Sequence, residues 1–322
     1  MKNPPETMFE SAFAEDTYKG LTSYPKYLLS KYIYDKRGDK LFQKIMDMPE
    51  YYLTSSEFDI IEQNAHSIIK SFSSKSGFDL IELGAGDGKK TKIILNKLVD
   101  ENIEFNYLPV DISQNVLDEL KESLRNEIPE VNVEVQQGTY FKTLEKLSEY
   151  NTRKKVIIVL GSNIGNLNHK EAVDFLGNIA EAMSEEDMLF MGFDQKKHPQ
   201  KILDAYNDSE GITEDFNKNL LVRINNELEG EFDIDNFLHW ETYDPETGTA
   251  KSFLVSKKQQ NINIKKIGLE VNFEAWESIH TEISQKYDDS IVNWLADEAG
   301  LSVEKSFQDR ENCYKNYIFR RK

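Results

Sequence analysis

The stretch FDLIELGAGDGKKT, residues 78–91, decides the fold of this chain. A largely apolar run at 80–83 leads into the glycine-rich GAGDG at 84–88, and apolar residues at helical spacing follow at 93–98. This order predicts a buried strand, a tight turn and an amphipathic helix, which is the opening unit of a doubly wound α/β domain. Because glycine has no Cβ, the backbone can turn sharply there and bring its amide groups close to a ligand at the helix start.

The residues around the turn indicate which ligand it holds. Gly88 comes one residue too early for the G-x-G-x-x-G pattern of dinucleotide sites. The acidic Glu82 precedes the turn, and Asp111 ends the next apolar run, NYLPVD. A carboxylate after the second strand suits the ribose hydroxyls of S-adenosylmethionine, so the pattern favours this cofactor. The alternative is a glycine turn that only joins a strand to a helix.

Composition limits the classes of protein to which the chain can belong. Its 322 residues are enough for two domains, and 39% of them are hydrophobic, which supports a packed core. A formal net charge of −18 repels phosphate backbones, so we expect no nucleic-acid partner. The single cysteine, Cys313, and five scattered histidines predict neither a disulfide nor a metal site. With no signal peptide and no apolar run near the roughly 20 residues of a membrane span, we expect a soluble cytoplasmic protein without a membrane partner.

Strands and helices alternate regularly after the organising strand. Apolar runs predict strands at 79–83, 106–110, 131–135, 155–160 and 188–192. Helical periodicity predicts helices between them at 90–98, 114–127, 141–148 and 169–183. Such a succession indicates parallel strands joined by right-handed crossovers.

The remaining segments predict a second domain. Residues 1–76 are expected to be mostly helical, with one helix starting at 54–57 (TSSE), and residues 200–230 are expected to be helical and polar. Alternating segments at 238–273 predict an antiparallel sheet. A helix at 290–299, followed by two strands, is expected to return to the α/β sheet.

The predicted domains are therefore interrupted in sequence. We expect a cofactor-binding domain at 61–195 that is completed by 287–322. A substrate-binding domain would consist of residues 1–60 and an insertion at 196–286.

Four stretches carry more polar groups than folding requires. They are YDKRG at 34–38 with PEYY at 49–52, LGSNIGN at 160–166, Tyr206 with GIT at 211–213 and Asn217, and HTEISQK at 280–286. Ligands of open α/β sheets bind beyond the carboxyl ends of the strands, which places Asn166 well for a substrate. Alternation along a strand predicts that Glu282 and Ser284 share one face.

At these residues the chain resembles the S-adenosylmethionine-dependent L-histidine Nα-methyltransferases of ergothioneine biosynthesis. The motifs occur in the family's order: YDKRG, MPEYY, ELGAGDGKKT, PVDIS, LGSNIGN, GFD, AYNDSEGIT-x-x-FN and TEIS-x-K. The resemblance extends from about Tyr24 to Lys286 and more loosely to the end of the chain. It implies an α/β fold with a Rossmann-like class I methyltransferase sheet and a second, α+β domain that binds the substrate.

The resemblance also implies which residues bind the cofactor. These residues are expected to be Gly84, Gly86, Lys90 and Asp111, with Thr139 and Tyr140 near the adenine.

On the substrate side, Asn166 and Tyr206 are expected to bind the carboxylate of an amino acid. Tyr51 and Tyr34 would surround the amine and the ring, and Tyr34 would act in catalysis by orienting the nitrogen lone pair. Hydroxyl and amide groups can hold a carboxylate without an arginine.

Glu282 and Ser284 are expected to hold an imidazole, because a carboxylate accepts an imidazole N–H. Ser252 stands in a stretch where some family members place a methionine beside this ring. Another aromatic amino acid or amine, such as tryptophan, is therefore an alternative substrate, although a carboxylate suits an imidazole better than an indole. The alternative from a different class of protein is a scaffold that binds S-adenosylmethionine without catalysis.

The implied reaction transfers a methyl group to the α-amine of histidine, up to three times, to give the trimethylated betaine hercynine. S-adenosylhomocysteine would be the second product, and no metal is needed, because the site has only to supply position and a deprotonated amine. We expect the partner to be a small molecule, the amino-acid substrate, and the protein to be a monomer.

Overall fold

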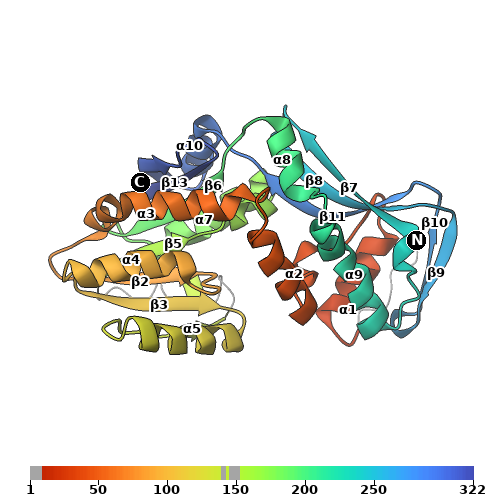
Figure 1. Cartoon of the computed structure of the whole chain (residues 1–322), viewed down its shortest axis with the longest axis horizontal. Coiled ribbons are helices and arrows are strands. Elements are labelled where there is room, and N and C mark those ends of the chain that lie inside the picture. The colour runs from red at the N-terminus through yellow and green to blue at the C-terminus, as the bar shows by residue number, and fades with distance from the viewer. Residues whose placement is uncertain (1–8, 139–142, 145–152) are drawn as a thin grey trace. The chain divides into compact units, whose positions relative to one another are not determined.

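The computed structural model describes residues 9–138, 143–144 and 153–322, which divide into two compact units (Figure 1). The first unit contains the residues up to Tyr52 together with His198–Ser284, and the second contains Leu53–Lys197 together with Gln285–Lys322. These bounds fall at 52/53, 197/198 and 284/285, whereas the domain limits predicted from the sequence were 60/61, 195/196 and 286/287. Which ligand each unit binds stays a prediction.

A seven-stranded sheet forms the middle of the second unit (Figure 1). Its strands are β2 (Phe78–Leu83), β3 (Phe105–Asp111), β4 (Gln136–Gln137), β5 (Lys154–Val159), β6 (Met188–Asp194), β12 (Leu301–Gln308) and β13 (Tyr314–Arg321). Their order is β12-β13-β6-β5-β2-β3-β4. The strands from β2 to β6 are parallel, whereas β13 runs antiparallel to both β6 and β12. The predicted α/β sheet, completed by C-terminal strands, is confirmed.

Helices cover both faces of this sheet. They are α3 (Tyr52–Phe72), α4 (Lys89–Asp100), α5 (Gln114–Glu127), α7 (His169–Ala182) and α10 (Asp289–Glu298), with a short 3₁₀ helix, η2 (Asn163–Asn166). Leu80 and Ile158 pack with residues of α3, α4 and α5, whereas Ile81 and Ile157 pack with residues of α7 and α10. Consecutive side chains of a strand point to opposite faces, so an apolar run is what a strand buried on both faces requires.

Two elements predicted for this unit are wrong in their bounds. The helix expected to start at 54–57 begins at Tyr52, so Glu57 lies inside α3 and not in its first turn, and its carboxylate is buried with partners from other segments. The strand predicted at 131–135 is reduced to an isolated bridge between Tyr107 and Val133, and the paired residues are Gln136–Gln137 at the edge of the sheet. Most of the helix predicted at 141–148 lies outside the described residues.

The first unit contains a four-stranded sheet and a separate hairpin. The sheet has the order β1-β11-β8-β7, and its strands are β1 (Lys26–Tyr27), β7 (Phe237–Asp244), β8 (Thr249–Ser256) and β11 (Ser278–Gln285). The hairpin pairs β9 (Gln260–Ile264) with β10 (Leu269–Phe273). The single antiparallel sheet predicted for 238–273 is therefore wrong, because the second neighbour of β8 is β11. Both strand pairs bury apolar side chains, so alternation predicted burial but not the pairing of strands.

The helices of the first unit are α1 (Ala12–Thr22), α2 (Lys36–Met46), α8 (Pro199–Tyr206) and α9 (Ile212–Leu228), with the 3₁₀ helices η1 (Ser30–Tyr32), η3 (Ile234–Asn236) and η4 (Lys265–Ile267). The helical region predicted at 200–230 is thus two helices. Between them the Asp208 carboxylate accepts the amides of Ile212 (2.9 Å) and Thr213 (2.8 Å), which stabilises the start of α9. No helix in the described part of the chain is long and apolar enough to cross a membrane.

Candidate active site

The glycine turn of the second unit joins β2 to α4 and meets the end of β3. Gly84, Gly86 and Gly88 have φ values of 80°, 53° and 65°, in the left-handed region that favours glycine. The amide of Gly84 donates to the carbonyl of Val110 (2.9 Å), and the amide of Gly86 donates to the Asp111 carboxylate (3.4 Å). A Cβ on Gly86 would meet no atom within 4 Å. The turn therefore borders open space and places a carboxylate beside its backbone amides.

Lys90 lies in the first turn of α4, directly after this glycine turn. Its ammonium donates to Glu57 Oε2 at 2.6 Å, and the same oxygen accepts the amide of Gly161 at 2.7 Å. The other carboxylate oxygen accepts from Asn316 Nδ2 at 2.8 Å. Glu57 was not among the residues that the sequence singled out, because an acid after TSS reads as part of a helix start. Its only sequence signal is its place beside the PEYY stretch.

The loop after β5 carries the predicted substrate residue Asn166. Gly161 and Ser162 both have a positive φ (85° and 59°), which turns the chain sharply at the end of the strand. The Ser162 hydroxyl accepts the amide of Asp194 (3.0 Å), and the hydroxyl of Tyr287 donates to the carbonyl of Ile164 (3.0 Å). The loop is thus held on both sides, and Asn166 at its end is exposed to solvent.

In the first unit, five aromatic side chains, which we call the aromatic group, form a connected set: Tyr34, Phe42, Tyr51, Tyr206 and Phe216. The Tyr34 ring lies 5.5 Å from Phe42 and 5.4 Å from Phe216, both in edge contacts. Tyr51 lies 6.4 Å from Phe42 and 6.2 Å from Tyr206. The sequence had indicated the three tyrosines but not Phe42. Phe216 was visible in the AYNDSEGIT-x-x-FN motif without a role.

Two polar groups adjoin the aromatic group. The hydroxyls of Tyr206 and Ser284 share a hydrogen bond of 2.7 Å. Desolvation of its hydroxyl, together with the negative charge of Glu282, raises the pKa of Tyr34 well above its usual value, although 38% of the residue is exposed. Tyr34 therefore keeps its proton at neutral pH and can donate or accept a hydrogen bond but does not serve as an anionic base.

Ser252 on β8 is 2% exposed and donates to the Glu241 carboxylate at 2.6 Å. Its backbone carbonyl accepts the hydroxyl of Thr281, which also donates to Asn217 Oδ1 at 2.6 Å. Ser252 is therefore part of a hydrogen-bonded network in the first unit.

The predicted site residues are divided between the two units. The first unit contains Tyr34, Tyr51, Tyr206, Glu282 and Ser284, and the second contains Gly84, Gly86, Lys90, Asp111 and Asn166. Thr139 and Tyr140 lie outside the described residues. Among the residues that are described, no three potential metal ligands (His, Cys, Asp or Glu) are grouped as a metal site requires.

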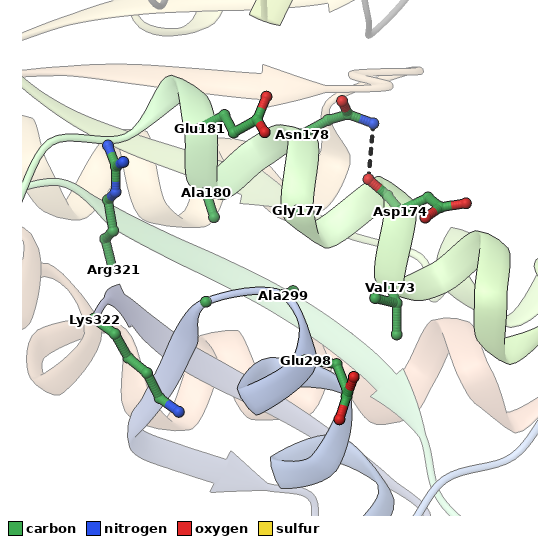
Figure 2. A pocket seen from close by; sticks show the side chains of 11 residues that line it. Val173, Asp174, Gly177, Asn178, Ala180, Glu181, Glu298, Ala299, Arg321 and Lys322 are labelled. Atoms are coloured by element: carbon green, nitrogen blue, oxygen red, sulfur yellow. Dashed lines mark hydrogen bonds between the residues drawn. The ribbon is translucent and has the colours of Figure 1, made fainter.

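A hollow of about 750 Å³ in the second unit lies among α7, the end of α10 and the C-terminus (Figure 2). Its lining includes Val173, the acidic Glu181 and Glu298, and the basic Arg321 and Lys322. Arg321 donates to the carbonyl of Met183 (2.5 Å), and Lys322 to Asp297 (2.6 Å). None of the predicted site residues lines this hollow.

The sheet order of the second unit, with β13 antiparallel between β12 and β6, and the glycine turn after β2 are those of the class I S-adenosylmethionine-dependent methyltransferase fold. Residues 13–321 match the family described as histidine-specific, S-adenosylmethionine-dependent methyltransferases. The chain belongs to this family, and the predicted family, fold class, cofactor and enzyme class are confirmed.

The individual relatives that resemble this chain are named for different substrates or pathways. A histidine N-alpha-methyltransferase of Mycolicibacterium smegmatis is 33% identical over 292 residues, which cover 90% of this chain and 89% of that protein. Ergothioneine biosynthesis protein 1 of Schizosaccharomyces pombe is 28% identical over 90% of this chain and 38% of its own length. An L-tryptophan methyltransferase of Psilocybe serbica is 27% identical over 89% of this chain and 86% of its own length.

Proposed function

We propose that this enzyme transfers methyl groups from S-adenosylmethionine to the α-amino group of L-histidine. The observation that carries the proposal is the aromatic group with the Tyr206–Ser284 hydrogen bond and Glu282 beside it. Aromatic faces suit an amine and a planar ring, and the hydroxyls and the carboxylate suit a carboxylate and an imidazole N–H. The histidine N-alpha-methyltransferase relative supports the same substrate.

The residues of the glycine turn fit S-adenosylmethionine. Gly84 and Gly86 would leave room for it, Asp111 would accept its ribose hydroxyls, and Lys90 would attract its carboxylate. Thr139 and Tyr140 remain the residues proposed for the adenine. When bound, the cofactor supplies a methyl group that is already activated on a sulfonium.

The chain's own residues would bind and orient the amino acid. Tyr206 and Asn166 would hold the carboxylate, and Tyr51 would pack against the substrate. Tyr34, whose pKa is raised by desolvation of its hydroxyl, stays protonated and would position the amine nitrogen through that hydroxyl. The amine would lose its proton to water, because Tyr34 already carries its own proton and cannot accept another.

The aromatic group also supports repeated methylation. A quaternary ammonium cannot donate a hydrogen bond, but it is attracted to the faces of aromatic rings. The partly exposed Tyr51 would offer such a face besides the amine-orienting Tyr34, so the product would keep an attractive neighbour after its N–H groups are gone. We therefore include the trimethylated betaine hercynine as the final product, and mass spectrometry of the products counts the methyl groups.

The substrate is tested with a panel of amino acids and the Glu282→Ala variant. We expect the wild type to prefer histidine over tryptophan, tyrosine and phenylalanine, because a site built to bond a polar ring rejects rings that leave its groups unpaired. Glu282→Ala should shrink this preference by about 10–100-fold in kcat/KM ratio. The exposed Glu274→Ala is the matched control and should leave selectivity unchanged. A wild type that prefers tryptophan, or a variant with unchanged selectivity, contradicts the imidazole assignment.

We further propose that the enzyme acts as a monomer in the cytoplasm and binds no nucleic acid. The net charge of −18 supports the last point, because it opposes association with phosphate backbones. Light scattering at several protein concentrations tests the monomer, and a mass above that of one chain contradicts it.

A further inference from the structure

We propose that Glu57 is a positioning residue of the cofactor site and that it acts by fixing the ammonium of Lys90. The proposal rests on the function proposed above for Lys90. Glu57 itself lies in α3 and has no exposed surface, so it would act on a ligand only through Lys90.

Three donors from three different segments meet on the Glu57 carboxylate. Lys90 comes from α4, Gly161 from the loop after β5, and Asn316 from β13, at distances of 2.6, 2.7 and 2.8 Å. Two of these donors belong to segments that carry predicted ligand-binding residues. The carboxylate thus joins the cofactor turn to the loop that carries Asn166 within one unit.

The packing leaves this carboxylate no freedom to follow Lys90. A Cβ on Gly192 of β6 would lie 2.3 Å from Glu57 Oε1 and 2.3 Å from the Tyr314 hydroxyl, so only glycine leaves room for the carboxylate there. Gly161 and Asn316 hold it from two further sides. A buried carboxylate fixed in this way is a rigid anchor. It holds the long, 19% exposed side chain of Lys90 in a single conformation.

Neutralising the anchor should therefore release Lys90. Glu57→Gln keeps the size of the side chain and one acceptor oxygen, but it removes the charge that pairs with the ammonium. We expect the Kd of S-adenosylhomocysteine, measured by calorimetry, to rise about 5–20-fold, because Lys90 must then be ordered during binding. Lys90→Met should weaken binding by a similar factor.

The double variant separates positioning from general damage. If Glu57 acts through Lys90, adding Glu57→Gln to Lys90→Met should change the Kd by less than about twofold. Asp187→Asn is the matched control, since Asp187 is also fully buried and paired with a lysine, Lys155, but at the start of β5. It should lower the melting temperature without changing the Kd. Where Glu57→Gln does not fold, Glu57→Asp, whose shorter carboxylate draws back from Lys90, takes its place in the same cycle.

Each result has one meaning. An unchanged or lower Kd in Glu57→Gln, or a loss that persists in the Lys90→Met background, overturns this inference and leaves the proposed function standing. A wild type that binds no S-adenosylhomocysteine overturns the proposed function and this inference with it. A Lys90→Met variant that binds like the wild type removes Lys90 from the site and equally overturns the positioning role.

Discussion

Asp111 ends β3 with both carboxylate oxygens turned toward backbone amides. One oxygen accepts the amide of Ser113 at 3.0 Å, and the other lies 3.4 Å from the amide of Gly86. The second distance is long for a hydrogen bond, so this oxygen has spare capacity for a stronger donor such as a ribose hydroxyl. Lys90 differs from Asp111 in this respect, because its ammonium already makes a short hydrogen bond of 2.6 Å to Glu57.

For Asp111 we predict that replacement by alanine weakens S-adenosylmethionine binding by about 1–3 kcal/mol, or 5–150-fold in Kd. The loss follows from removing the acceptor for the ribose hydroxyls. Calorimetric titration measures it, and the exposed Asp118→Ala on α5 is the control with the same charge change. Equal affinities of Asp111→Ala and the wild type would show that Asp111 only shapes the turn.

At the scale of elements, the unit of strand, turn and helix from β2 to α4 is held from inside by Glu82. Its carboxylate accepts from Thr91 of α4 (2.5 Å) and from the hydroxyl of Tyr107 on β3, and it is 2% exposed. Burial raises the pKa of Glu82 to about 7, although these hydrogen bonds oppose the rise. The acid that the sequence associated with the cofactor turn therefore fastens α4 and β3 to β2.

This raised pKa predicts a pH dependence of stability. The fold keeps a proton on Glu82 that the unfolded chain releases near its usual pKa of 4.5, so this contribution is present below pH 4.5 and is lost as the pH rises to about 7. In the wild type, this group should lower the free energy of unfolding by up to about 3 kcal/mol between pH 4.5 and pH 7. Glu82→Gln should abolish this part of the pH dependence. Denaturation followed by Trp294 fluorescence, with Trp240 and Trp276 of the first unit replaced by Phe, isolates the second unit. The exposed Glu122→Gln is the control and should keep the wild-type dependence of the free energy of unfolding on pH. If Glu82→Gln keeps that dependence as well, this assignment is contradicted.

At the scale of the whole molecule, the chain leaves the second unit at Lys197 and returns to it at Gln285. Both ends are tied to Asp194, whose carboxylate pairs with Lys197 and with Lys286, the latter at 2.8 Å. The backbones also bond, since the amide of Tyr287 donates to the carbonyl of Asp194 at 2.8 Å. Burial alone would raise the pKa of Asp194, but Lys286 and Lys197 outweigh it and hold the pKa below its usual value.

Breaking this network should be costly. Asp194→Asn leaves two buried ammonium groups without their anion, so we expect the free energy of unfolding of the second unit to fall by about 3–5 kcal/mol. The Trp294 fluorescence described above measures it. The matched control is Glu304→Gln, which breaks a partly exposed pair with Arg320 and should cost less than about 1 kcal/mol. Similar losses in the two variants would contradict a special role of Asp194.

The local elements of the second unit were predictable from the sequence. An apolar run, a glycine turn and helical spacing depend on neighbours within a few residues, so β2, α4 and α5 appear where the pattern placed them. The family motifs likewise indicated the three tyrosines of the aromatic group. By contrast, the pattern at 54–57 was read as a helix start, because a Thr-Ser-Ser-Glu sequence has the same local signature whether it caps a helix or lies inside one.

Only the tertiary structure decided which distant residues meet. Glu57, Lys90, Gly161 and Asn316 are separated by up to 259 positions, and nothing in the spacing of one predicts the others. The same holds for β8, which pairs with β11 while β9 and β10 pair with each other. Periodicity reports whether a side chain is buried, whereas the partner it is buried against depends on how separate segments pack. The sequence by itself therefore determined the family of this protein and local elements such as β2, α4 and α5, and the packing determined the network that holds Lys90.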